Sequence, residues 1–469
     1  MSSKERRRKQ KTPDGGYPER EAVNRPKTEG ALSLSAARVA ESPHGSENHL
    51  MEKVVEKENM ERALKRVEQN KGAGGVDGME VGELRSYLKK NWLRIKGELL
   101  EGMYKPSPVR RVEIPKSGGK RRNLGIPTVV DRLIQQALLQ VLTPVFDPEF
   151  SESSYGFRPG RSAHQAVKKA KEHVEEGYEW VVDIDLEKFF DKVNHDILMS
   201  RMARKVKDKR MLKLLRAYLT AEVMVEGVRV RTEGGTPQGG PLSPLLANVM
   251  LDELDKELEK RGHRFTRYAD DCNIYVKSER AGHRVMESVT KFLEKRLKLK
   301  VNKKKSGMDK PQKRKMLGFS FWRPKGETRL RLAPDSVKRL KDKIRQLTGR
   351  TWGISMDERL KRLNTYLRGW MGYYHIVETP GIMEKLDRWT RRRLKMCVLK
   401  QWKKPKTRRK KLIALGVPQS EVHLISACRR GEWFLSNCKW VNIALCPSYW
   451  EERGYVSLST RYKALRSVS

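Results

Sequence analysis

The chain has 469 residues, and its 101 Lys and Arg against 58 Asp and Glu give it a net charge of +43. That excess is typical of proteins that bind nucleic acid. The alternative is a ribosome-associated protein or one that is simply very basic. No apolar run approaches the length of a membrane span, and no secretory signal is recognisable at the N-terminus. Five cysteines without a C-x-x-C pair argue against a zinc ribbon or a disulfide framework. Together these features predict a cytoplasmic protein.

The positive charge is concentrated toward the C-terminus. Residues 331–469 hold 32 Lys and Arg against 11 Asp and Glu, and residues 391–411 hold twelve basic residues and no acid. Such a segment can neutralise many phosphates, so we expect nucleic-acid binding that weakens steeply with salt.

The predicted elements begin after a polar arm at residues 1–48, which has the composition of a disordered segment. Helical spacing of apolar residues follows at 51–69, and a hairpin is expected over 109–127 with its turn at 116–120. The next predicted elements are a helix at 128–143, a buried strand at 180–185, helices within 196–219, a Gly/Pro-rich loop at 234–244, a helix at 243–260, a helix at 282–297 and a strand at 316–321.

From about residue 333 helical patterns dominate, over 335–348, 357–370 and 381–402. Mixed strands and helices followed by helices alone predict an α+β fold with an appended helical domain. The expected borders are a disordered basic arm at 1–48, an N-terminal extension at 49–105, an α+β domain at 106–330, a helical domain at 331–415 and a short C-terminal segment at 416–469.

Two acidic clusters lie beside apolar strands in this basic chain. Asp270 and Asp271 occupy the tip of an expected hairpin, and Asp183 and Asp185 alternate along the strand at 180–185, so they share one face. Neighbouring carboxylates repel one another, and oxygen ligands of this kind suit Mg²⁺. Three carboxylates brought together can hold two ions for phosphoryl transfer. For a single such Asp, a turn or a helix cap is the better reading.

Several motifs resemble those of group II intron reverse transcriptases, in that family's order. Tyr268-Ala269-Asp270-Asp271 matches the Tyr-x-Asp-Asp box, and Asp185 with Phe189-Phe190 resembles the first catalytic motif. Residues 235–244 (GTPQGGPLSP) look like the loop that contacts nucleotide and template. Residues 70–78 (NKGAGGVDG), 154–162 (SYGFRPGRS) and 362–374 (RLNTYLRGWMGYY) are similar to other elements of the family. The resemblance covers roughly residues 50–460 and implies a right-hand polymerase, with fingers and palm built on an antiparallel sheet, followed by an α-helical thumb or maturase domain.

The resemblance also implies roles for individual residues. Asp185, Asp270 and Asp271 are expected to be catalytic and to bind two Mg²⁺ ions, with Mn²⁺ as a substitute. Asp183 is the alternative to Asp185 in the first motif, and for Asp271 a role without direct contact to the metal is the alternative. Phe190 falls where the family places the residue beneath the incoming sugar, although a core role for Phe189 or Phe190 is the alternative. The remaining expected dNTP contacts are Lys116, Arg122, Gln238 and Lys305.

For template, primer and RNA the expected residues are Gly239, Leu317, Gly318, Phe319, Arg391, Arg392, Arg393, Lys403 and Lys404. Most aromatic residues that interleave with the C-terminal cations are read as core. The implied partners are group II intron RNA, an RNA template, a DNA primer or target and dNTPs, without a membrane, the choice between monomer and homodimer being left open. The implied location is the cytoplasm of a bacterium, associated with nucleoid or ribonucleoprotein.

The function implied is an RNA-directed DNA polymerase that binds its intron RNA, assists splicing and copies the intron into DNA during retrohoming. Many relatives end in an endonuclease domain with paired C-x-x-C motifs, whereas Cys428, Cys438 and Cys446 are spaced ten and eight residues apart. The chain therefore resembles the bacterial class without that domain, and residues 416–469 are expected to be a short DNA-binding segment. Two alternatives are a non-catalytic RNA-binding splicing factor and a reverse transcriptase repurposed for host defence or repair.

Overall fold

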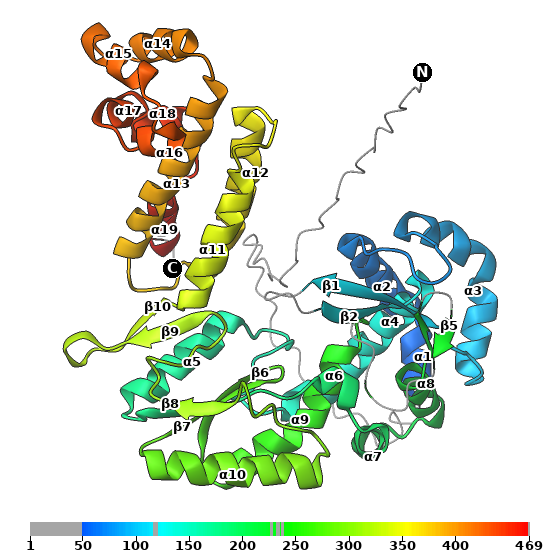
Figure 1. The fold of residues 1–469 in the computed structure, drawn as a ribbon. Coiled ribbons are helices and arrows are strands. Elements are labelled where there is room, and N and C mark those ends of the chain that lie inside the picture. The colour runs from blue at the N-terminus through cyan, green and yellow to red at the C-terminus, as the bar shows by residue number, and fades with distance from the viewer. Residues whose placement is uncertain (1–48, 116–120, 226–227, 231–234, 236–238, 468–469) are drawn as a thin grey trace, which may run out of the picture. The chain divides into compact units, whose positions relative to one another are not determined.

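The computed structural model describes residues 49–115, 121–225, 228–230, 235 and 239–467 (Figure 1). The expected arm at 1–48 lies outside these residues. The α+β character predicted from the sequence is confirmed, with strands mixed among helices up to about residue 332 and helices alone thereafter. None of the helices in these ranges is long and apolar enough to cross a membrane.

The first part of the chain packs helices against a four-stranded sheet. The helices are α1 (Leu50–Val55), α2 (Lys57–Asn70), α3 (Leu84–Leu100) and α4 (Val129–Phe146), and the strands are β1 (Val109–Pro115), β2 (Arg121–Ile126), β4 (Val223–Val225) and β5 (Val228–Val230). The sheet order is β2-β1-β4-β5, and β1 and β2 form the predicted antiparallel hairpin. The single helix expected at 51–69 is in fact two, because the backbone of Glu56 leaves the helical region at ψ 139°.

A second sheet of four antiparallel strands lies at the centre of the chain. Its order is β6 (Arg264–Tyr268), β7 (Asp271–Val276), β3 (Trp180–Ile184) and β8 (Gly307–Asp309). Alternate residues of β3 enter two different cores: Val182 and Ile184 pack with α9 (Ser243–Lys260) and α10 (Glu279–Arg296), while Val181 packs with α5 (Ala163–Glu175). Figure 1 shows α10 and α5 on opposite faces of this sheet. Helices therefore cover both faces of the sheet, and the acidic residues predicted to be functional lie at the ends of its strands.

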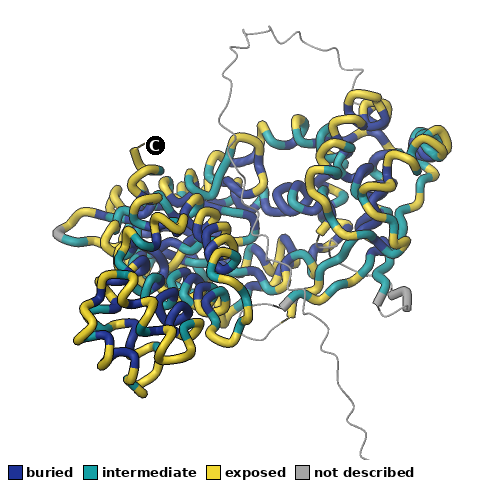
Figure 2. Tube along the Cα trace, turned by 90° about the horizontal axis from the view of Figure 1, so that it is seen from above, coloured by how far each residue is buried: buried dark blue, intermediate teal, exposed yellow. Residues whose placement is uncertain are grey.

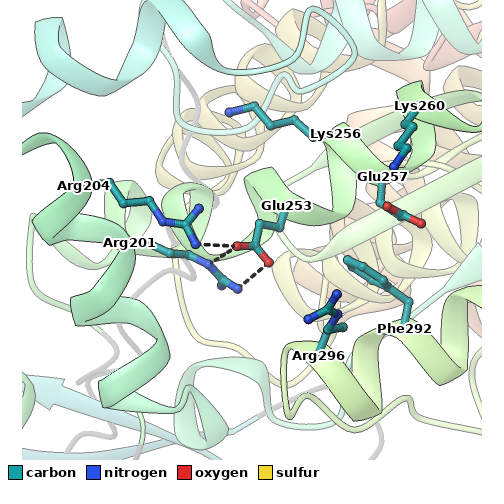
Figure 3. A pocket seen from close by; sticks show the side chains of 8 residues that line it. All are labelled: Arg201, Arg204, Glu253, Lys256, Glu257, Lys260, Phe292 and Arg296. Carbon is teal, nitrogen blue, oxygen red and sulfur yellow. Dashed lines mark hydrogen bonds and ion pairs between the residues drawn. The ribbon is translucent and has the colours of Figure 1, made fainter.

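Three short helices connect the two sheets along the chain: α6 (Phe189–Lys192), α7 (His195–Lys205) and α8 (Lys209–Leu219). Between α7, α9 and α10 lies a hollow of ≈ 470 Å³ lined by five basic side chains, two acidic ones and Phe292 (Figure 3). Buried Arg201 grips Glu253 with two hydrogen bonds of 2.9 and 2.6 Å, which fastens α7 to α9. The acidic clusters of the sequence do not line this hollow.

The C-terminal part begins with a strand pair and continues as helices. The elements are β9 (Phe319–Trp322), β10 (Arg329–Leu332), α11 (Pro334–Leu347), α12 (Met356–Tyr374), α13 (Gly381–Gln401), α14 (Pro405–Ala414), α15 (Gln419–Ala427), α16 (Gly431–Leu435), α17 (Lys439–Ala444), α18 (Pro447–Glu452) and α19 (Leu458–Arg466). The strand expected at 316–321 starts only at Phe319. Leu317 and Gly318 have φ of 52° and 85°, and this left-handed backbone is incompatible with a strand.

One hydrophobic core runs through the expected thumb and the C-terminal segment, and it joins residues from α11, α12 and α13 with Val441, Trp450 and Leu458. Buried Asp387 on α13 accepts hydrogen bonds from the hydroxyls of Tyr455 and Ser457 and from the amides of Leu458 and Ser459. Figure 2 shows buried residues on the inner sides of these helices and exposed residues outside. Residues 416–469 thus fold together with 331–415, and the border at 415 stays a prediction from sequence alone.

Candidate active site

The acidic hairpin is a two-residue turn between β6 and β7, closed by the pair Tyr268 and Asp271. Ala269 at the turn has φ of 56°, a left-handed conformation that a residue with a side chain adopts only when its surroundings hold it there. β7 pairs with β3 so that Asn273 lies opposite Asp183 and Cys272 opposite Ile184. This register carries the end of β3, where Asp185 follows, beside the hairpin turn.

The carboxylates on these strand ends interact electrostatically. Burial, and then the neighbouring charges of Asp270, Asp183 and Asp185, raise the pKa of Asp271 to about 7. Burial also raises the pKa of Asp183 to about 6, with Arg314 acting against it at 3.7 Å. Carboxylates that repel one another are stabilised by a cation placed between them. Because carboxylate oxygens are hard ligands, a hard divalent cation such as Mg²⁺ suits such a site.

Asp185 is held by a loop that follows α10. Lys305 Nζ lies 3.0 and 2.9 Å from its two carboxylate oxygens, and the side-chain amide of Asn302 donates to one of them at 3.1 Å. Ser306 accepts a hydrogen bond from the Asp185 amide at 2.9 Å. The ammonium group of Lys305 therefore compensates the negative charge of Asp185, a carboxylate predicted to bind metal.

The donor set fits divalent cations, although it is not a closed cage. Within the ranges that the structure describes, no three His, Cys, Asp or Glu side chains form a ready-made metal site. Asp185 is paired with Lys305, whereas Asp270 and Asp271 share the turn. A divalent ion at these strand ends would be held by carboxylate oxygens of Asp185, Asp270 and Asp271 and would take over the compensation of charge that Lys305 gives to Asp185.

The residue expected beneath the sugar of the incoming nucleotide, Phe190, lies on α6, next to Gly235 at the start of the Gly/Pro-rich loop. Phe189 is buried and Phe190 is half-buried, and their rings meet edge to face with centroids 5.2 Å apart. Gly235 has φ of 93°, and a Cβ there would lie 2.7 Å from the carbonyl oxygen of Phe190. Phe189 is thus a core residue, whereas Phe190 packs against the same core and remains partly exposed.

The other expected nucleotide contacts are described unevenly. Lys116 and Gln238 lie outside the described residues, and of Arg122 the structure describes only its place on β2 opposite Ile114. Gly239 has φ of 124°, and a Cβ on it would collide with the carbonyl of Gly125, so the loop passes directly over the end of β2. Only a glycine permits that approach.

The expected nucleic-acid contacts of the C-terminal part divide into two groups. Lys403 and Lys404 are exposed, and Arg391 is half-buried. Arg392 hydrogen-bonds Ser436 and the carbonyl of Trp433, and Arg393 bonds Thr348 and the carbonyl of Arg345. These two guanidinium groups fasten α13 to its neighbours, which leaves fewer of their donors for RNA.

The loop expected to grip the primer is anchored from the helical domain. Phe319 is buried, so its side chain packs in the core and only its backbone is available to a ligand. Tyr373 on α12 donates its hydroxyl to the carbonyl of Leu317 at 2.9 Å, and a Cβ on Gly318 would lie 2.5 Å from the hydroxyl of Tyr374. The shape of residues 317 and 318 therefore depends on α12.

Arg267, two residues before the turn, is the functional residue that sequence analysis missed. It is fully buried, and its five N–H groups each meet an acceptor: Asp255 twice at 2.7 and 2.5 Å, Asn248, Ser154 and the carbonyl of Ala269. Burial alone would lower the pKa of Arg267, but the facing carboxylate of Asp255 raises it. The residue pattern offers no signal for this role, because a basic residue on a strand usually faces solvent.

Family models match two consecutive parts of this chain. Residues 114–321 match the reverse transcriptase (RNA-dependent DNA polymerase) model, and residues 337–414 match the group II intron maturase-specific domain. Protein YkfC of Escherichia coli is 34% identical over 297 residues, which cover 55% of this chain and 78% of YkfC. The chain belongs to the group II intron reverse transcriptase and maturase family. The predicted family and right-hand polymerase fold are thereby confirmed.

The group II intron-encoded protein LtrA of Lactococcus lactis is 41% identical over 202 residues, 42% of this chain and 33% of LtrA. The putative COX1/OXI3 intron 2 protein of Saccharomyces cerevisiae is 31% identical over 239 residues, 49% of this chain and 26% of that protein. The chain thus spans a third or less of the length of these two relatives. Its two domains are those of an RNA-directed DNA polymerase and of a splicing maturase, and the first generally works with divalent metal ions.

Replacing Arg267 by Met should destabilise the protein by about 3–5 kcal/mol, because it leaves the Asp255 carboxylate buried without a partner. The measurement is the free energy of unfolding from urea titration. Arg264→Met on the same strand, whose side chain is 58% exposed, is the matched control and should change stability little. The double variant Arg267→Met with Asp255→Leu should recover part of the stability. If Arg267→Met unfolds like the control, the network does not stabilise the hairpin.

Proposed function

We propose that this chain copies RNA into DNA at a centre in which Asp185, Asp270 and Asp271 hold two Mg²⁺ ions, Mn²⁺ being a substitute. We propose further that it binds the group II intron RNA that encodes it, assists its splicing and copies it during retrohoming. The observation that supports the polymerase most is the strand register, which brings Asp185 at the end of β3 beside the turn that carries Asp270 and Asp271. Buried Arg267 holds that turn through the carbonyl of Ala269, and burial together with the neighbouring carboxylates raises the pKa of Asp271 to about 7.

The side chains have separate roles in this reaction. When bound, the two ions lower the pKa of the attacking 3′-hydroxyl and neutralise the leaving pyrophosphate. Lys305, released from Asp185, supplies positive charge and a proton to the leaving group. Phe190 excludes the 2′-hydroxyl of a ribonucleotide. Lys116 and Arg122 bind the triphosphate, the Arg with two parallel hydrogen bonds, and Gln238 orients the nucleotide.

The cluster of carboxylates opposes a purely structural role for the domain, because a non-catalytic splicing factor gains nothing from repelling acids at a strand end. RNA is bound in our proposal by phosphate contacts from the exposed cations of the helical domain, with Lys403 and Lys404 among them. Gly239 and the 317–319 loop would contact template and primer through their backbones.

Asp270→Asn with Asp271→Asn should reduce cDNA synthesis to background while leaving the affinity for intron RNA unchanged, because only the metal ligands are removed. Primer extension and filter binding measure the two properties. Asp309→Asn on β8 of the same sheet is the control and should keep both. Equal loss of extension and RNA binding in the double variant would show that the acids are structural.

Phe190→Val should admit ribonucleotides, lowering the dNTP-over-NTP preference by at least about tenfold, as expected when a pocket loses a bulky wall. The ratio of kcat/KM for the two nucleotides measures it. Phe189→Ala, a change in the core, should cost about 3–5 kcal/mol of stability without altering the preference of the folded fraction. An unchanged ratio in Phe190→Val would mean that Asp183, not Asp185, sets the register of the motif.

Neutralising Lys403, Lys404 and Lys406 together, each to Gln, should flatten the salt dependence of RNA binding by about 2 in the slope of log K against log salt. The matched control is Arg392→Gln with Arg393→Gln, since these side chains bond within the protein; it should lower the Tm with a smaller effect on the slope. If the Lys variant keeps the full slope, the RNA lies on another surface.

A further inference from the structure

The segment 153–158 runs beside the catalytic hairpin as an extra edge. The amide of Tyr155 donates to the carbonyl of Arg267, and the amide of Arg267 donates to the carbonyl of Ser153, both at 2.9 Å. A Cβ on Gly156 would collide with the amide nitrogen of Ala269, and the side-chain amide of Asn248 donates to the carbonyl of Gly156 at 2.8 Å. The two segments therefore form one rigid unit with no room between them.

Phe157 projects from this unit with two unusual properties. Its ring is 50% exposed, although large aromatic side chains usually gain stability by burial. Its φ is 59°, a left-handed conformation that is unfavourable for a residue with a bulky side chain. Neither property stabilises the fold, and strained residues of this kind concentrate at functional sites.

The neighbours of Phe157 show what holds it and what it faces. Arg158, which is buried, bonds Asp147 and the carbonyls of Ser151 and Ser154, so the backbone after Phe157 is fixed. The ring of Phe157 lies 6.0 Å from that of Tyr268, tilted by 45°. Two adjacent rings thus flank the turn that carries Asp270 and Asp271.

We propose that Phe157 is a positioning residue whose exposed ring packs against the terminal base pair of the primer–template duplex. This inference rests on the proposed polymerase function, because the primer's 3′-hydroxyl must then lie at the carboxylates beside Tyr268. The occupant is nucleic acid because the ring lies against Tyr268, beside the turn where the 3′-hydroxyl of the primer must lie, and an exposed aromatic face suits stacking on a base. The strained backbone aims the ring, and Gly156 and Arg158 prevent its relaxation.

The test compares three substitutions in the full-length chain. Phe157→Ala removes the ring but keeps the strained backbone, Phe157→Gly removes both, and Phe157→Tyr keeps the ring. We expect the dissociation constant for an RNA template annealed to a DNA primer to rise about tenfold in the Ala and Gly variants and to stay near that of the unmodified chain in the Tyr variant. The number of nucleotides added per binding event should fall in parallel.

Leu93→Ala, on a side chain that is 85% exposed on α3, is the control for loss of an exposed apolar group and should change neither quantity. Thermal unfolding shows that each variant is folded, and Phe157→Gly should melt no lower than Phe157→Ala. Unchanged duplex binding in Phe157→Ala, or recovery in Phe157→Gly, would overturn the inference. If the unmodified chain itself extends no primer, the proposed function fails instead.

Discussion

The catalytic hairpin depends on the buried guanidinium of Arg267. A charge removed from water costs several kcal/mol unless good geometry and further hydrogen bonds offset it. Here all five donors are satisfied, by Asp255 and Asn248 on α9, by Ser154 in the neighbouring segment and by the carbonyl of Ala269 in the turn. The same group that compensates Asp255 therefore fixes the residue next to Asp270. The hydrogen bonds of Arg267 therefore contribute to the stability of the sheet and also determine the geometry of the turn.

This arrangement lets like charges be held together. Asp271 and Asp183 have raised pKa values because burial and neighbouring carboxylates act on both, and separation would relieve them. The hairpin is packed tightly on one side, since the backbone of Gly156 lies directly against Ala269 and the backbone of Ser153 and Tyr155 bonds to Arg267. Lys305 compensates Asp185 from the other side. The fold thus holds several carboxylates close together at the ends of these strands.

The sequence predicted what depends on local pattern. Alternation with a Gly-Gly turn predicts the hairpin at 109–127, and an apolar run predicts the strand at 180–185. Two adjacent acids between short apolar runs predict the hairpin tip at 268–271. Arg267 was missed because its partners lie 12, 19 and 113 residues away, a relation that no periodicity encodes. The strand at 316–321 was placed three residues early, since apolar composition does not reveal the left-handed backbone at Leu317. Arg392 and Arg393, predicted from the sequence to contact RNA, are half-buried and also hydrogen-bond within the protein, a feature that the sequence does not reveal.

The same long-range logic joins the two domains. The loop at 317–318 is shaped by the hydroxyls of Tyr373 and Tyr374 on α12, and Glu378 just beyond that helix accepts from the amide of Leu330 and pairs with Lys171 on α5. His164 on α5 donates through Nε2 to the carbonyl of Tyr373 at 2.7 Å. These contacts tie α12 to residues 317 and 318 and, through α5, to the face of the sheet that carries Asp183. Helix α12 and the residues that follow it therefore hold parts of both domains together.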